Sequence, residues 1–188
     1  MTTPTSLPFT GDDTADRLLA EYPLALLIGF ALDQQVTVQK AFSGPADLKK
    51  RLGHLDAAKI AAMPPDELAD VFRERPALHR FPGSMAGKVQ ALCAAIAVEY
   101  GNDAAAVWRD AKDGQDLERR LLALPGIGDM KAKSIIAVLG NRFGVRPPGY
   151  EQVAPTWPTL GDVDSAEALA EYQAGKRAKK AAMRAAAE

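Results

Sequence analysis

The sequence is poor in cysteine and in long apolar runs, and both shortages narrow the class of protein. Cys93 is the only cysteine in 188 residues, which excludes an intrachain disulfide and a cysteine-rich metal site. No apolar run reaches the ~18 residues of a membrane span, and the N-terminus lacks a basic-then-apolar signal pattern. His54 and His79 are too isolated to suggest a metal site. We therefore expect a cytoplasmic protein without membrane contact, associated with the nucleoid if it is bacterial.

The sequence also lacks the polar–apolar alternation of a half-buried strand, and it contains no internal repeat. From Asp12 onward the apolar residues recur at helical spacing, so we predict an all-α fold. Composition divides the chain into a flexible Thr/Pro-rich tail at 1–11, a helical domain at 12–146, a Gly/Pro-rich loop at 147–164 and a basic helix at 165–188.

Prolines, glycines and capping residues predict the helix boundaries inside the domain. A long buried helix is expected over residues 23–42, ended by Gly44 and Pro45. Another long helix is expected over 84–100, with Ser84 as its cap. The remaining helices are expected at 47–52, 65–73, 103–111 and 115–123, and from the glycine turn at 126–128 to Gly140.

The stretch LPGIGDMKAK, residues 124–133, places Gly126 and Gly128 between two helical patterns. Two glycines one residue apart allow a tight turn and leave no side chains over its N–H groups. The next helix begins at once, so its N-terminal dipole points the same way, which favours an anion such as phosphate. A helical hairpin with a glycine cap and no ligand is the alternative interpretation.

This stretch resembles the helix-hairpin-helix motif, whose pattern is LPGhGxxxAxxhh with h apolar. The matching residues are Leu124, Pro125, Gly126, Ile127, Gly128, Ala132, Ile135 and Ile136. The resemblance implies that the hairpin binds a phosphate of double-stranded DNA without reading its sequence. Gly126 and Gly128 would donate N–H groups, and Lys131 and Lys133 would add phosphate contacts. It also implies a monovalent cation, Na⁺ or K⁺, on the main-chain carbonyls of Leu122, Leu124 and Ile127.

Two further stretches are similar to DNA glycosylases built on this hairpin. LLIGFALDQQVTVQKA resembles a helix of that superfamily, notably of the alkylbase glycosylases, and Gln34 and Gln35 carry the likeness. AGKVQAL, residues 86–92, is like the family's (K/R)AxxL helix start. The chain thus resembles the HhH-GPD base-excision glycosylases, which implies the helical HhH-GPD fold. Gln34 and Gln35 would pack near the lesion or fill the gap it leaves; a solvent-facing polar stripe is the alternative.

Cleavage of an N-glycosidic bond produces a positively charged sugar, so a carboxylate must stabilise it or activate water. The resemblance implies an aspartate beyond the Gly/Pro-rich loop, in a window that corresponds to residues 148–151. Glu151 is the only carboxylate there and is our predicted catalytic residue. Asp162 and Asp164 are alternatives if residues 147–161 are an insertion, and an exposed glutamate without a role also remains open.

Other family features are missing or displaced. Met130 occupies the position of the Schiff-base lysine of the bifunctional members, so no strand-cleaving lyase step is expected. With one cysteine the chain cannot hold the iron–sulfur cluster of some members, and no cofactor is required. Phe81 and Met85 are candidates for the apolar wedge, and Tyr150 for the base pocket; packing into the core is their alternative.

Charge alone does not mark a nucleic-acid binder, because the net charge is −1. Basic residues nevertheless gather after the turn and again at 176–184, where a solvated helix face is the alternative interpretation. We expect a monomeric, monofunctional DNA glycosylase acting on duplex DNA with a damaged base. A glycosylase-fold module that binds DNA or lesions without catalysis is the second hypothesis, and a helical scaffold with no DNA role is the third.

Overall fold

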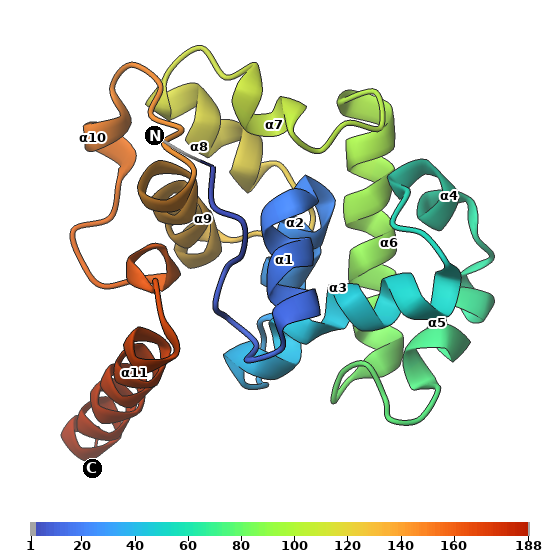
Figure 1. Cartoon of the computed structure of the whole chain (residues 1–188), viewed down its shortest axis with the longest axis horizontal. Coiled ribbons are helices and arrows are strands. Elements are labelled where there is room, and N and C mark those ends of the chain that lie inside the picture. Colours follow the sequence, from blue (N-terminus) through green and yellow to red (C-terminus); the bar gives the residue numbers. More distant parts are fainter. Residues whose placement is uncertain (1–2, 188) are drawn as a thin grey trace.

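The computed structural model describes residues 3–187, and over that range the fold is helical throughout, which confirms the all-α prediction. The elements are α1 (Asp13–Glu21), α2 (Pro23–Leu32), α3 (Val38–Leu52), α4 (Ala57–Ala62), α5 (Pro65–Arg73), α6 (Pro82–Glu99), α7 (Ala106–Arg109), α8 (Gly114–Leu122), α9 (Asp129–Arg142), α10 (Tyr150–Val153), the 3₁₀ helix η1 (Leu160–Asp162) and α11 (Ala166–Ala186) (Figure 1). Within the described residues, no helix is both long and apolar enough to cross a membrane.

Helix α2 is the centre of the fold, and α1, α3 and α6 pack around it (Figure 1). Every residue from Leu24 to Leu32 is buried, as expected of a helix that is apolar on all sides. Pro23 occupies the first turn, where its missing N–H costs no hydrogen bond. Cys93 is buried in α6, and burial raises the pKa of its thiol to about 12, so the thiol stays protonated.

The predicted long helix over 23–42 is wrong, because the chain leaves the helical conformation between α2 and α3. Gln35 has a positive φ of 57°, which no α-helix accommodates. Thr37 then starts α3 by accepting the N–H of Lys40 at 3.2 Å. We call residues 33–37, between the two helices, the glutamine loop; it places Gln34 and Gln35 outside any helix.

Gly44 and Pro45 do not end a helix, contrary to the prediction, and residues 47–52 belong to the same helix α3. The role of Gly44 is close packing, since a Cβ there would overlap Leu32 of α2. Gly29 makes the reciprocal approach, because a Cβ there would overlap the ring of Phe42. The sequence marked Gly44 as a helix breaker, whereas the fold uses both glycines to bring α2 and α3 together.

Two other boundary predictions need correction. Ser84 does not cap α6: the helix begins at Pro82, after Phe81, and no side chain caps it. Gly140 does not end α9, which continues to Arg142. A Cβ on Gly140 would overlap the Tyr150 hydroxyl, so this glycine admits the tyrosine from the following segment. That segment, predicted as a loop, contains α10 and η1.

The predicted flexible tail at 1–11 is anchored over the part that the structure describes, residues 3–11. Leu7 and Phe9 are completely buried in the core. The carboxylate of Asp16 in α1 accepts hydrogen bonds from the N–H groups of Phe9 and Thr10 at 3.2 and 2.9 Å. Burial of Leu7 and Phe9 therefore anchors this segment in spite of its Thr/Pro-rich composition.

Two predicted helices are confirmed. The helix over 65–73 is α5, and the basic helix from Ser165 is α11, which Ser165 caps.

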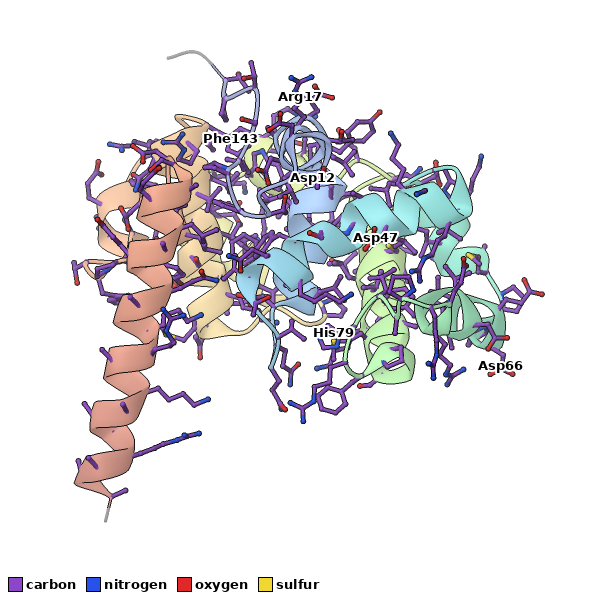
Figure 2. The ribbon with its side chains drawn as sticks, turned by 60° about the horizontal axis from the view of Figure 1, so that its bottom comes forward. Asp12, Arg17, Asp47, Asp66, His79 and Phe143 are labelled. Atoms are coloured by element: carbon purple, nitrogen blue, oxygen red, sulfur yellow. The ribbon has the colours of Figure 1, made fainter. Side chains whose placement is uncertain are left out.

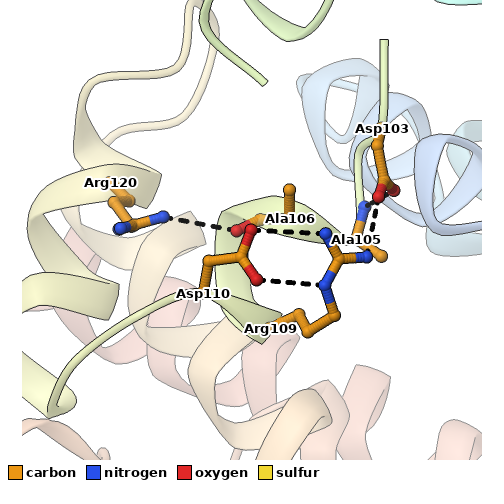
Figure 3. A network of polar contacts seen from close by, with 6 residues as sticks. All are labelled: Asp103, Ala105, Ala106, Arg109, Asp110 and Arg120. Atoms are coloured by element: carbon orange, nitrogen blue, oxygen red, sulfur yellow. Dashed lines mark hydrogen bonds and ion pairs between the residues drawn. The ribbon is translucent and has the colours of Figure 1, made fainter. Parts of the chain in front are cut away.

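The corner between α7 and α8 is held by a polar network (Figure 3). Arg109 pairs with Asp103 at 2.7 Å and, through two nitrogens, with Asp110 at 3.0 and 3.2 Å. Arg120 donates to the carbonyl of Ala106 at 3.3 Å. Arg120 lies in the last turn of α8, so the network ties α7 to the side of that helix.

Candidate nucleic-acid interface

The α8–α9 turn is anchored by apolar side chains and bent by glycine. Leu124 and Ile127 are buried, and the N–H of Ile127 donates to the carbonyl of Leu124 at 3.2 Å. Between them Gly126 has a φ of +84°, a left-handed conformation that favours glycine. Gly128 is exposed, and a Cβ there would meet no atom within 4 Å. The turn therefore anchors its main chain in the core while leaving one side open to solvent.

The N-terminus of α9 opens on that exposed side. Its first hydrogen bond runs from the N–H of Ala132 to the carbonyl of Gly128, at 2.9 Å. The N–H groups of residues 129–131 precede it and have no partner within the helix. Gly128 is the N-cap, and no side chain caps the helix. Asp129 adds an exposed carboxylate in the first turn. Free N–H groups at the positive end of a helix dipole can bind a phosphate oxygen.

The turn packs against the end of α2, which lies far from it in the sequence. The ammonium group of Lys131 donates to the carbonyls of Ala31 and Gly126 at 3.2 and 3.3 Å. The Cβ of Ala31 lies 3.6 Å from where a Cβ on Gly126 would be, so the two segments are in close contact. Lys131 thus bridges the turn and the segment that leads into the glutamine loop.

The start of α6 meets the glutamine loop from the other side. Lys88 donates to the amide oxygen of Gln34 at 2.6 Å. The buried ring of His79 bonds the carbonyl of Leu32 through Nε2 at 3.0 Å, and its Nδ1 accepts the N–H of Phe81 at 2.9 Å. Because Nδ1 is an acceptor, Nε2 carries the proton and the ring is neutral. Burial lowers the pKa of His79, which favours this form.

Figure 2 shows His79 near the glutamine loop, which joins the light-blue helices, on the face turned toward the bottom of the view. Phe81, two residues further, is 40% exposed and is the large apolar side chain that this segment offers to solvent. Gln35 is also exposed, at the tip of the glutamine loop. The structure therefore brings Gln34, Gln35 and Phe81 to the same region as the glycine turn.

Asp33 is a residue of this region that the sequence reasoning missed. It lies at the end of α2, and among residues 3–187 its carboxylate has no hydrogen-bond or ion-pair partner. Burial raises the pKa of Asp33, while the nearby charges of Lys176 and Lys131 act in the opposite direction. Its position beside the glutamine pair was a signal, but the predicted continuous helix treated it as an ordinary helical residue.

Two predicted pocket residues lie in the core instead. Met85 is 2% exposed, packed on the inner face of α6. Tyr150 is 5% exposed, and its hydroxyl donates to the carbonyl of Ile136 at 3.3 Å. Of the two predicted wedge residues, Phe81 is therefore the one with free surface. Met85 and Tyr150 fit the core alternative that the sequence left open.

Lys133 and the cation ligands are already engaged in part. Lys133 forms an ion pair with Glu118 at 2.7 Å and donates to the carbonyl of Val153 at 2.7 Å. The carbonyl of Leu124 accepts the N–H of Ile127 within the turn, as described above. The ammonium group of Lys131 donates to the carbonyl of Gly126, so a positive charge already contacts one carbonyl of the turn. A monovalent cation on Leu122, Leu124 and Ile127 stays a prediction.

The three carboxylates predicted for catalysis lie away from the turn. Glu151 is exposed on α10, which packs on α8; next to it, the N–H of Gly114 at the start of α8 donates to the carbonyl of Pro148 at 2.8 Å. Asp162 caps η1 by accepting the N–H of Thr159 at 2.8 Å. Asp164 is exposed just before α11.

Beside Asp162 the structure has an open pocket of mixed polarity. It is lined by Ala137, Asn141, Tyr150, Trp157, Thr159 and Asp162. These residues belong to the second half of α9 and to the segment that follows it, so the pocket and the turn lie at opposite ends of the α8–α9 pair.

Comparison with protein-family models, with curated proteins and with solved structures gives no match to this chain. Its function is therefore argued from the motifs and from the way in which the fold arranges them.

Proposed function

We propose that the chain is a monofunctional DNA glycosylase of the HhH-GPD type, which binds duplex DNA at the α8–α9 turn and hydrolyses the bond between a damaged base and its sugar. One observation carries the proposal: the segments that resemble the glycosylase motifs meet on one surface. Lys131 joins the turn to the end of α2, and Lys88 joins the glutamine loop to α6. A helical scaffold without a ligand would not require that convergence.

Each part of this surface has a role in base excision. The free N–H groups at the start of α9 would hold a backbone phosphate, which fixes position without reading sequence. A base that is flipped out of the stack leaves a gap, and a side chain of the protein must fill it. Gln35 is exposed in the glutamine loop, and Phe81 is exposed next to His79, which contacts the end of α2, so these two residues are the proposed wedge.

The reaction requires a carboxylate near the sugar to stabilise its developing positive charge or to activate water. Asp33 is the partly buried carboxylate beside the turn, and it has no partner among the described residues that would compete for it. We place it first. The carboxylates predicted from the sequence come after it: Glu151 is exposed on α10, Asp162 caps η1, and Asp164 is exposed just before α11.

The proposal includes base release without strand cleavage. Met130 is 65% exposed on the first turn of α9, at the position where a lyase would have its nucleophilic lysine. Lys131, the next residue, is turned toward Ala31 and Gly126 rather than outward. Met130 has no amine, and the amine of Lys131 is held by two main-chain carbonyls, so hydrolysis is the step that the chain would perform.

The test is a single-turnover assay on duplexes that each carry one lesion: alkylated, deaminated or oxidised bases, with undamaged DNA as the control. We expect one lesion class to yield abasic sites, seen as strand breaks only after alkali, and no covalent adduct after borohydride. An efficient borohydride adduct would refute the monofunctional mechanism. DNA binding without release of any base would assign the chain to the non-catalytic binding class, and absence of DNA binding would refute the proposal.

A further inference from the structure

Helix α11 is attached to the fold over its first turns only. Leu169 is its buried residue, and Tyr172 and Gln173 are half-buried. Gln173 exchanges two side-chain hydrogen bonds with Gln39 of α3, at 3.1 and 2.7 Å. From Ala174 to Ala187 every residue is exposed. The second half of α11 is therefore a helix without a packing partner among the described residues.

One face of α11 changes from apolar to basic along its length. Leu169, Tyr172, Gln173 and Lys176 are spaced by three or four residues, so they share the face that contacts the fold. Lys180 and Arg184 continue the same face in steps of four, a rise of about 6 Å each. We call Lys176, Lys180 and Arg184, with the neighbouring Arg177, the basic stripe. The opposite face carries alanines.

The charge of this half-helix is of one sign. Between Tyr172 and Ala187 the sequence has Lys176, Arg177, Lys179, Lys180 and Arg184 and no acidic residue. Glu167 and Glu171 stand before it, on the part that is attached to the fold. The whole chain has a net charge of −1, whereas this half-helix carries only positive charges. The basic residues therefore create a local region of positive potential on the molecule.

The basic stripe begins beside the candidate interface. Gln173, three residues before Lys176, bonds Gln39 in the first turn of α3, the helix that follows the glutamine loop. In Figure 2 the α11 ribbon continues well below the level of the other helices, on the side of the view toward which the glutamine loop and His79 lie. The free half of α11 therefore extends on the side of the molecule where His79 lies (Figure 2).

We propose that the basic stripe of α11 is a second DNA contact, which follows the phosphate backbone of the duplex that the α8–α9 turn holds. The inference rests on the proposed function. It adds a sequence-independent contact that lengthens the DNA site beyond the turn and supplies a run of positive charge in a chain whose net charge is −1. Phosphates along a duplex present a continuous row of negative charge to such a stripe.

The exposed face of α11 fits a nucleic acid better than a membrane. Helices that lie in a bilayer interface bury Trp, Phe or Leu opposite their basic face. Opposite the basic stripe, α11 carries alanines, and Met183 is its one large apolar residue beyond Tyr172. Alanine also gives the helix high intrinsic stability, so it can stay helical without packing and present its charges in register.

The experiment compares two triple variants of the full chain by the salt dependence of their affinity for an undamaged duplex of about two helical turns. The first is Arg177→Gln, Lys180→Gln, Arg184→Gln, which spares Lys176 because it contacts Tyr172. The matched control is Lys50→Gln, Lys59→Gln, Lys112→Gln, which removes the same charge from exposed sites elsewhere. We expect the first variant to reduce the slope of log K against log salt by about 0.9 for each phosphate that the helix no longer neutralises. The control should keep the parent slope, and circular dichroism should show both variants folded.

The outcomes separate the two proposals. If the parent binds DNA and both variants keep its slope, the α11 contact is refuted while the turn remains. If the parent binds no DNA, the proposed function fails and the inference fails with it. If the parent binds vesicles with anionic lipid but the first variant keeps full DNA affinity, the stripe serves a membrane and the inference is overturned.

Discussion

The two ends of the α8–α9 pair differ in how they satisfy their polar groups. At the far end, Asp116 accepts the N–H of Lys112 and pairs with Arg119 and Arg120, and Asp162 caps its own helix. At the turn end, the start of α9 has no side-chain cap and Asp33 has no partner within residues 3–187. The N–H groups at the start of α9 and the Asp33 carboxylate are therefore the polar groups at this end that a ligand from outside the chain could bind.

The two ends therefore differ in which groups are available to a ligand. The far end has a pocket, ion pairs and the carboxylates that the sequence singled out, but most of its charged groups are already matched to one another. At the turn end, the N–H groups at the start of α9 and the Asp33 carboxylate have no partner among the described residues, so they can act on something outside the chain.

Replacing a carboxylate by its amide, first near the turn and then on α10, should give the largest difference in the rate of base release. We expect Asp33→Asn to lower the single-turnover rate of base release on the order of 10²-fold, the usual cost of removing a charge that stabilises a transition state. Glu151→Gln, which removes an exposed charge far from the turn, should leave the rate of base release essentially unchanged. The reverse pattern would move the reaction to the far end and restore the sequence-based prediction.

Stability distinguishes a functional Asp33 from a structural one. Because the folded-state pKa of Asp33 is raised above its unfolded value, its contribution to the free energy of unfolding is present below the unfolded pKa and is lost as pH rises through the folded pKa. At neutral pH the uncharged Asn should therefore be at least as stable as the parent, measured by thermal melting. A variant that loses both rate and stability would indicate a structural role.

Damage to the far end should cost stability and spare DNA binding. Gly140→Ala places a methyl group against the Tyr150 hydroxyl, and such overpacking typically costs about 1–3 kcal/mol. The matched control is Gly175→Ala, in open space on α11, which should raise helix stability by up to about 1 kcal/mol. Both variants should bind duplex DNA like the parent. Weaker binding by a folded Gly140→Ala protein would mean that the two ends are coupled.

The smallest expected effect is a pH dependence at His79. Its folded pKa is lowered, so its neutral form contributes stability that is fully present above the unfolded pKa of about 6.5 and is lost as pH falls through the folded pKa. Protonation would also remove the acceptor of the Phe81 N–H. Melting temperatures of the parent and of His79→Gln between about pH 5 and 8 should show a steeper acid decline in the parent. Titration of the His79 ring by NMR at or above about 6.5 would contradict this.

The sequence predicted the helical class, the turn and most helices, because helical periodicity and glycine spacing are local signals. The prediction from the sequence failed where the role of a residue depends on packing against a residue that is distant in the sequence. Gly44 and Gly140 looked like helix ends, but they admit Leu32 and Tyr150. Leu7 and Phe9 looked like part of a loose tail and are core residues.

The candidate site was predicted in part for the same reason. The turn and the glutamine pair could be named from their spacing, but their proximity depends on tertiary contacts through Lys131 and Lys88. For Asp33 the sequence offered only its position beside the glutamine pair. Its distinction is burial without a partner, which only the folded chain reveals.

If the free N-terminus of α9 binds a DNA phosphate, substitutions at Gly128 should change DNA affinity without unfolding the chain. Gly128 has the extended conformation of an N-cap, so Gly128→Asp would cap α9 with its own carboxylate and occupy the anion site. Gly128→Ala adds only a methyl group in open space and leaves the N–H groups free.

The measurement is the dissociation constant of both variants for a duplex across a salt titration, with melting temperatures recorded alongside. We predict that Gly128→Asp melts at or above the parent temperature yet binds about 10- to 100-fold more weakly, the reduction expected when a charge-assisted hydrogen bond is removed. Gly128→Ala should bind like the parent. Equal affinities of Gly128→Asp and the parent at every salt concentration would contradict the account.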